Sequence, residues 1–121
     1  MRVLAATAIA VCLATSCAHA GEVEIVDARA VAGGDGSLTF HVTLAHGDTG
    51  WEHYADKWEV LAPDGTVLGT RVLLHPHENE QPFTRSLAGV EIPAGVASVS
   101  IRAHDKVHGD GPETFAIELA R

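Results

Sequence analysis

The sequence predicts an all-β domain, a sandwich of about seven antiparallel strands, and two observations predict it. No segment carries apolar residues at the 3.6-residue period of an amphipathic helix. Turn signals rich in glycine, proline and aspartate recur about every ten residues, which is the spacing of short strands in a sandwich or barrel. A chain of 121 residues, of which 46% are hydrophobic and 20% charged, suits one small globular domain.

The first two strands are expected at residues 22–31 and 38–44. In the first strand Val23 and Ile25 face the core, and the alternation shifts phase near Val26. The second strand has the most regular alternation, with apolar residues at every other position: Leu38, Phe40, Val42 and Leu44. The inward apolar residues of these two strands predict the inner face of one sheet.

Five more strands follow, each bounded by a turn or a polar loop. We expect them at residues 55–61, 66–74, 83–90, 97–103 and 113–119. Trp58 and Val60 of the third strand face the core, and Pro63-Asp64-Gly65 forms the next hairpin turn, because proline presets φ and glycine accepts positive φ. Seven such strands with a tryptophan on the third are typical of an Ig/fibronectin III-like sandwich.

The first twenty residues have the pattern of a secretory signal peptide. Arg2 precedes an apolar run at 3–14, and Ala18-His19-Ala20 offers a small-residue cleavage site. We therefore expect residues 1–20 to be removed and residues 21–121 to form the domain, which is periplasmic or secreted. The apolar run is too short for a transmembrane segment, so none is expected in the mature chain.

Two alternatives at the N-terminus stay open. Cleavage after Ala18 would leave His19 as the free N-terminus, whereas a poor lipoprotein box at 13–17 would make Cys17 a lipid anchor. After cleavage at Ala20 neither Cys12 nor Cys17 remains, so the domain has no disulfide. The net charge of −8 argues against nucleic acid and anionic membranes as partners, because both select basic patches.

Six histidines are expected at one end of the sandwich. If successive strands run up and down, the connections 46–53, 75–82 and 104–112 share one end. They contain His46, His53, His75, His77, His104 and His108, together with several carboxylates. The connections at the other end contain no histidine.

Imidazole and carboxylate groups gathered in this way suit a divalent transition metal ion, Zn(II), Cu(II) or Ni(II). Proline in His75-Pro76-His77 favours an extended chain with both rings on one side, and His104 and His108 converge if 105–108 forms a helical turn. The expected ligands are His75, His77, His104 and His108, followed by His53 and Asp105. His46 is the weakest candidate because it can belong to the second strand. Trp51 is a candidate for lining the site.

The sequence carries no nucleophile elbow, no glycine-rich loop before a helix and no HExxH motif, so we do not expect an enzyme. The function expected is binding of copper or zinc for periplasmic buffering or delivery. A pH sensor built from the same histidines is one rival interpretation. Others are a metal-free interaction module that binds another envelope protein and, more weakly, a metal-dependent enzyme.

The last loop and strand resemble the corresponding stretch of the CopC-type periplasmic copper-binding sandwiches. In that family a histidine precedes a glycine and then an inward aromatic residue, as His108, Gly111 and Phe115 do here. The resemblance implies copper as the metal, and an N-terminal histidine as a ligand, which His19 would supply under the alternative cleavage. The His75-Pro76-His77 loop and the segment from Trp51 to Trp58 do not match the family.

Overall fold

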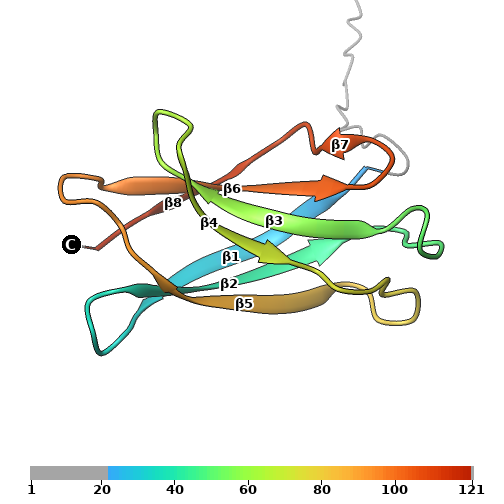
Figure 1. Ribbon diagram of the computed structural model, residues 1–121, viewed down its shortest axis with the longest axis horizontal. Helices are drawn as coiled ribbons and strands as arrows, with labels where there is room; N and C mark the ends of the chain where they lie inside the picture. The colour runs from blue at the N-terminus through green and yellow to red at the C-terminus, as the bar shows by residue number, and fades with distance from the viewer. Residues whose placement is uncertain (1–21, 121) are drawn as a thin grey trace, which may run out of the picture.

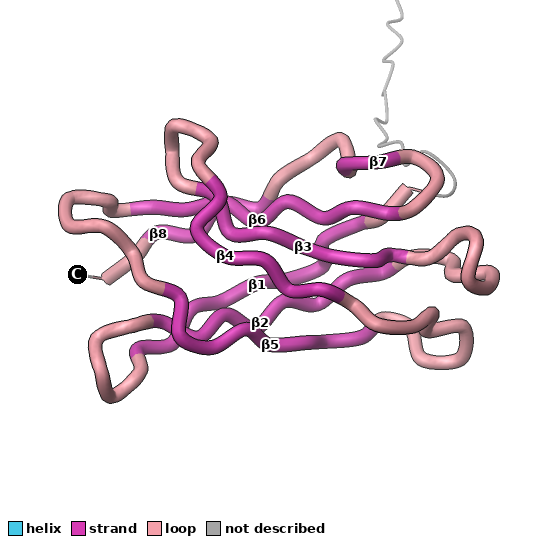
Figure 2. The backbone as a smooth tube through the Cα atoms, viewed as in Figure 1, coloured by secondary structure: helices cyan, strands magenta, loops and turns pink. Residues whose placement is uncertain are grey.

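Two antiparallel sheets packed face to face form the part of the chain that the computed structural model describes, residues 22–120 (Figures 1 and 2). The first sheet has the order β1-β2-β5, with β1 at Glu24–Ala32, β2 at Leu38–Ala45 and β5 at Phe83–Val90. The prediction of an Ig/fibronectin III-like sandwich of antiparallel strands is confirmed. The signal peptide and the lipid-anchor alternative concern residues that lie outside the described range.

The second sheet has the order β4-β3-β6-β7, and β8 also pairs with β6. Its strands are β3 at Ala55–Leu61, β4 at Val67–Val72, β6 at Ser98–Asp105, β7 at Gly109–Asp110 and β8 at Phe115–Glu118. All pairings in both sheets are antiparallel. No described residue belongs to a helix that could span a membrane.

The core lies between the inner faces of the two sheets. Phe40, Val42 and Leu44 of β2 meet Trp58 of β3, and all four side chains are fully buried. The predicted phase shift in the first strand is confirmed as an irregularity of the β1–β2 register between Ile25 and Asp27. Such a shift lets the strand keep its apolar residues inward on both sides of the irregularity.

Several strand boundaries differ from the prediction by one or two residues, and the end of the sixth strand is the one that matters for the site. The sixth strand was expected to end at Ala103, but β6 continues through His104 to Asp105, and the short strand β7 then pairs back onto these two residues. The inner row of β6 therefore runs Val99, Ile101, Ala103 and Asp105, and a carboxylate lies at the end of an apolar row.

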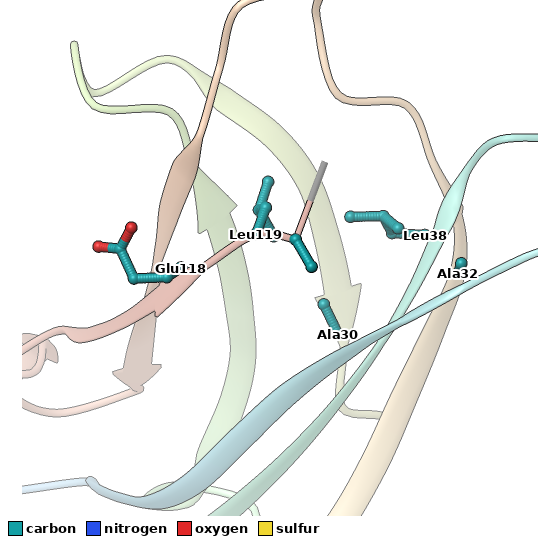
Figure 3. A pocket seen from close by; sticks show the side chains of 6 residues that line it. Ala30, Ala32, Leu38, Glu118 and Leu119 are labelled. Atoms are coloured by element: carbon teal, nitrogen blue, oxygen red, sulfur yellow. The ribbon is translucent and has the colours of Figure 1, made fainter.

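The two ends of the sandwich differ in chemistry. The connections 33–37, 62–66 and 91–97 contain no histidine, and next to them lies a small apolar hollow (Figure 3). Its lining comes from the end of β1, the start of β2 and the C-terminal segment: Ala30, Ala32, Leu38, Glu118, Leu119 and Ala120. The opposite end carries the histidine-bearing loops, which contact one another as described next.

Candidate metal centre

Asp105 occupies the middle of the histidine-bearing end. Its side chain is 0% exposed because the alternation of β6 turns it into the sandwich. Asp105 Oδ1 accepts hydrogen bonds from the backbone amides of Val107 at 2.8 Å and His108 at 2.7 Å. The carboxylate therefore ends the strand by bonding the first amides of the turn that follows, as aspartate does in many turns.

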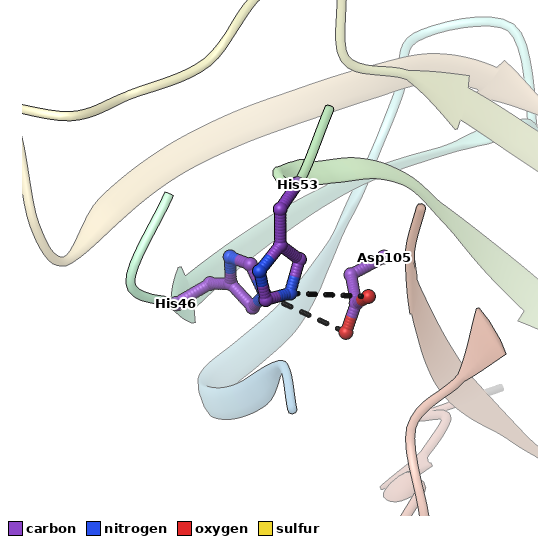
Figure 4. A group of neighbouring side chains, drawn as sticks. All are labelled: His46, His53 and Asp105. Atoms are coloured by element: carbon purple, nitrogen blue, oxygen red, sulfur yellow. Dashed lines mark ion pairs between the residues drawn. The ribbon is translucent and has the colours of Figure 1, made fainter. Parts of the chain in front are cut away.

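Three imidazole rings surround this carboxylate. His46 Nε2 lies 3.5 Å from Asp105 Oδ2, and His53 Nε2 lies 3.5 Å from Oδ1 (Figure 4). His108 Nδ1 lies 3.2 Å from each of the two oxygens. The His53 ring lies between the other two rings, with centroids 4.8 Å from His46 and 5.1 Å from His108.

These four side chains come from segments that are far apart in the sequence. His46 follows directly after β2, His53 precedes β3, and Asp105 and His108 flank the turn after β6. One nitrogen of His46, one of His53 and one oxygen of Asp105 all lie within 4.8 Å of one another. We call His46, His53, Asp105 and His108 the central cluster; together they offer three imidazole nitrogens and a carboxylate.

The Asp105 carboxylate is held in its ionised form. Burial by itself would raise the pKa of Asp105, but the amide hydrogen bonds from His108 and Val107 help to outweigh it, and this pKa is lowered below its usual value. A buried anion that is ready to accept a cation is consistent with a ligand role, and the same charge also affects the acid stability of the fold.

We expect metal-free protein to lose the stability contributed by Asp105 in acid. Because the pKa of this carboxyl is lower in the folded than in the unfolded chain, its contribution is complete above about pH 4 and disappears as the pH falls through the folded pKa. Urea unfolding in chelator from neutral to acid pH measures it. The free energy of unfolding should fall less steeply below about pH 4 in Asp105→Asn than in the wild-type protein.

His77 was expected as a ligand, but its two ring nitrogens face Arg85 and Asp48 instead of the other expected ligands. Its ring stacks on Phe83 with centroids 3.9 Å apart, and Arg85 donates a hydrogen bond to Nε2 at 2.9 Å. Burial first, then Arg85 and His75, lower the pKa of the His77 imidazole. His77 Nδ1 faces Asp48 Oδ2 at 3.8 Å, so neither nitrogen faces Asp105.

His75 and His104, also expected ligands, lie outside the central cluster. His75 is exposed, and its Nδ1 lies 2.9 Å from the carbonyl oxygen of Pro76. His104 Nδ1 lies 2.6 Å from Asp56 Oδ1. The expected convergence of His104 with His108 is corrected: neighbouring residues of a strand face opposite sides, so His104 lies on the outer face of β6 while Asp105 lies inside.

Of the six expected ligands, the structure brings His53, Asp105 and His108 together, and it adds His46. The sequence contained a signal for His46, because it continues the inward row of Phe40, Val42 and Leu44 by two residues. Its side chain is fully buried. Trp51, expected to line the site, is 64% exposed and packs edge-on against Tyr54, with ring centroids 5.7 Å apart.

Comparison with curated proteins finds a protein of Halomicrobium mukohataei named "Putative lipoprotein". It is 40% identical to this chain over 97 residues, which are 80% of this chain and 47% of the relative. The chain thus spans about half the length of the relative that it matches. No family model and no solved structure matches the chain, so the resemblance of its last strand to copper-binding sandwiches gains no support here.

Proposed function

We propose that this protein is exported and binds one divalent transition metal ion in the central cluster, as a buffer or carrier of that metal outside the cytoplasm. A single observation carries the proposal: three imidazole nitrogens lie 3.2 to 3.5 Å from the oxygens of one fully buried carboxylate. The name of the 40% identical relative supports export, since lipoproteins are carried out of the cytoplasm. The signal-like pattern at 1–20 supports it as well.

The separations of His46 and His53 from Asp105 are longer than those of ordinary charge-assisted hydrogen bonds. A charge-assisted bond between a ring N–H and a carboxylate is about 2.7–2.9 Å long. Two ligand atoms in a tetrahedral site with bonds of 2.0–2.1 Å lie about 3.3–3.4 Å apart, which is the edge of the tetrahedron. The His46 Nε2–Oδ2 and His53 Nε2–Oδ1 distances of 3.5 Å are close to this edge and longer than the hydrogen bond of His104 to Asp56, 2.6 Å, whereas His108 Nδ1 lies within hydrogen-bond range of both oxygens at 3.2 Å.

The donor set restricts the metal. Three imidazoles and one carboxylate are borderline ligands, which Zn(II), Cu(II) and Ni(II) accept, whereas Cu(I) selects the thiolate and thioether groups that residues 22–120 lack. His46 and His53 would contribute Nε2, and His108 would contribute Nδ1. Because all four ligands come from the protein, the site suits holding a metal more than activating a water molecule in an open position.

Titration with Zn(II), Cu(II) and Ni(II) in competition with a chromogenic chelator tests the proposal. We expect one ion per chain, and a loss of affinity on the order of 100-fold in His53→Ala and in His108→Ala, since each removes a ligand. His104→Ala is the matched control, because His104 lies near the same end but bonds Asp56, and we expect its affinity to be unchanged. Equal losses in all three variants, or no stoichiometric binding, would contradict the proposal.

A metal-free interaction module is the second candidate, and exposed apolar side chains favour it. Trp51, Leu74 and Val107 are 64%, 73% and 59% exposed, and each lies on a different loop of the histidine-bearing end. Exposed apolar groups on neighbouring loops are typical of surfaces that contact another protein. An envelope protein captured equally well with and without chelator would favour this function over metal binding.

A further inference from the structure

We propose that Asp48 is the positioning residue of this metal centre: it holds His46 in the tautomer that presents Nε2 toward Asp105. The inference rests on the proposed metal-binding function and assigns a role to a residue outside the four ligands. Asp48 lies in the loop between β2 and β3, and its side chain is fully buried. A buried carboxylate at this depth requires partners that compensate its loss of water.

All the hydrogen-bond partners of Asp48 are donors. Oδ1 lies 2.5 Å from His46 Nδ1 and also accepts the backbone amide of Ala55 at 3.1 Å. Oδ2 accepts the backbone amide of His77 at 2.6 Å. With two backbone N–H groups fixed in this way, the carboxylate acts as a pure acceptor, and the ring must supply the proton of the contact between His46 and Asp48.

The proton on Nδ1 determines what the other nitrogen can do. A neutral imidazole carries one N–H, so a ring protonated on Nδ1 has its lone pair on Nε2. In His46 this Nε2 lies on the side of Asp105, 3.5 Å from Oδ2. A carboxylate that bonds the remote nitrogen of a metal-binding histidine fixes its tautomer, orients the ring and makes it a better ligand.

Asp48 also joins two of the three histidine-bearing loops. Its bond to the His77 amide connects the β2–β3 loop to the β4–β5 loop, across 29 residues of sequence. His77 is fixed in turn by its stacking on Phe83 and by the hydrogen bond from Arg85 to Nε2. His77 therefore supports the site through its backbone, which gives a role to a buried histidine whose ring faces away from Asp105.

Asparagine at position 48 cannot replace the carboxylate in either orientation of its amide. If the NH2 group takes the place of Oδ2, it faces the backbone N–H of His77, so two donors point at each other. If the NH2 group takes the place of Oδ1, it faces the backbone N–H of Ala55, again donor against donor. It also makes His46 accept a hydrogen bond at Nδ1, which moves the ring proton to Nε2. Either arrangement weakens the site, and the second places a proton on the nitrogen that faces Asp105.

The test combines ring tautomers with metal affinity. Long-range ¹H–¹⁵N correlation of metal-free, ¹⁵N-labelled protein should show His46 protonated on Nδ1 and not on Nε2. Asp48→Asn should bind Zn(II) 10–100-fold more weakly than the wild-type protein, the range typical of residues that orient a ligand. Asp56→Asn is the matched control, because Asp56 bonds His104 at 2.6 Å outside the central cluster, and its affinity should not change.

The outcomes separate this inference from the proposed function. If the wild-type protein binds no metal, the proposed function fails whatever the tautomer of His46. If the protein binds metal but His46 carries its proton on Nε2, or Asp48→Asn binds Zn(II) as tightly as the wild type, only the role of Asp48 is overturned. An equal loss of Zn(II) affinity in Asp56→Asn overturns the role of Asp48 as well. Should Asp48→Asn fail to fold, the tautomer of His46 in the wild-type protein decides.

Discussion

Asp105→Asn is expected to lower the affinity for Zn(II) by more than either single histidine variant, on the order of 100-fold or beyond. Asp105 is adjacent to all three imidazoles and supplies the one negative charge among the four ligands. The uncharged amide removes the attraction between this charge and the metal, which is strong because the group is fully buried. Its NH2 group also points a donor at a nitrogen that would bind the ion.

The fold should tolerate this substitution, which makes the binding result interpretable. The asparagine oxygen can take the place of Oδ1 and accept the amides of Val107 and His108, so the turn after β6 keeps its hydrogen bonds. Asp110→Asn on the neighbouring strand β7 is the control for general loss of negative charge, since Asp110 is exposed. Retention of full Zn(II) affinity in Asp105→Asn would remove Asp105 from the site.

The strands could be predicted because the inner faces of a sandwich impose an alternating pattern on the sequence. The bounds expected for β3 and β5 are those that the structure has. The end of β6 was misplaced because a polar pair, His104 and Asp105, looks like the start of a loop. Strand β7 has only two residues and therefore no periodicity that a sequence could reveal.

The residues of the site were harder to predict than their location. Counting alternating connections placed the histidine-bearing loops at one end, and contacts such as that between Asp48 and His77 join two of them. Whether a residue belongs to the central cluster depends on which face of the strand its position points to. His46 and Asp105 continue inward-facing rows, whereas His104 continues an outward-facing row. The role of Asp48 depends on contacts across loops, which no local pattern records.

Binding of metal is expected to stabilise the fold. A ligand that binds only the folded state adds RT ln(1 + [L]/Kd), about 2.7 kcal/mol when free Zn(II) is at 100 times its Kd. The four ligands are separated along the chain and meet only when both sheets have formed, so the unfolded state offers no comparable site. Urea unfolding with Zn(II) and with chelator measures the increment.

At the same free Zn(II), the increment should fall to about 0.4 kcal/mol or less in Asp105→Asn, while the protein without metal should still unfold cooperatively. The reason is that the apolar core is complete without the site: Phe40, Leu44 and Trp58 are fully buried in an apolar cluster that contains none of the four ligands. Removal of the metal should therefore loosen the histidine-bearing loops and leave the sheets intact, visible as faster amide exchange confined to those loops. An equal increment in the wild type and in Asp105→Asn would mean that Zn(II) stabilises the protein through scattered surface histidines instead.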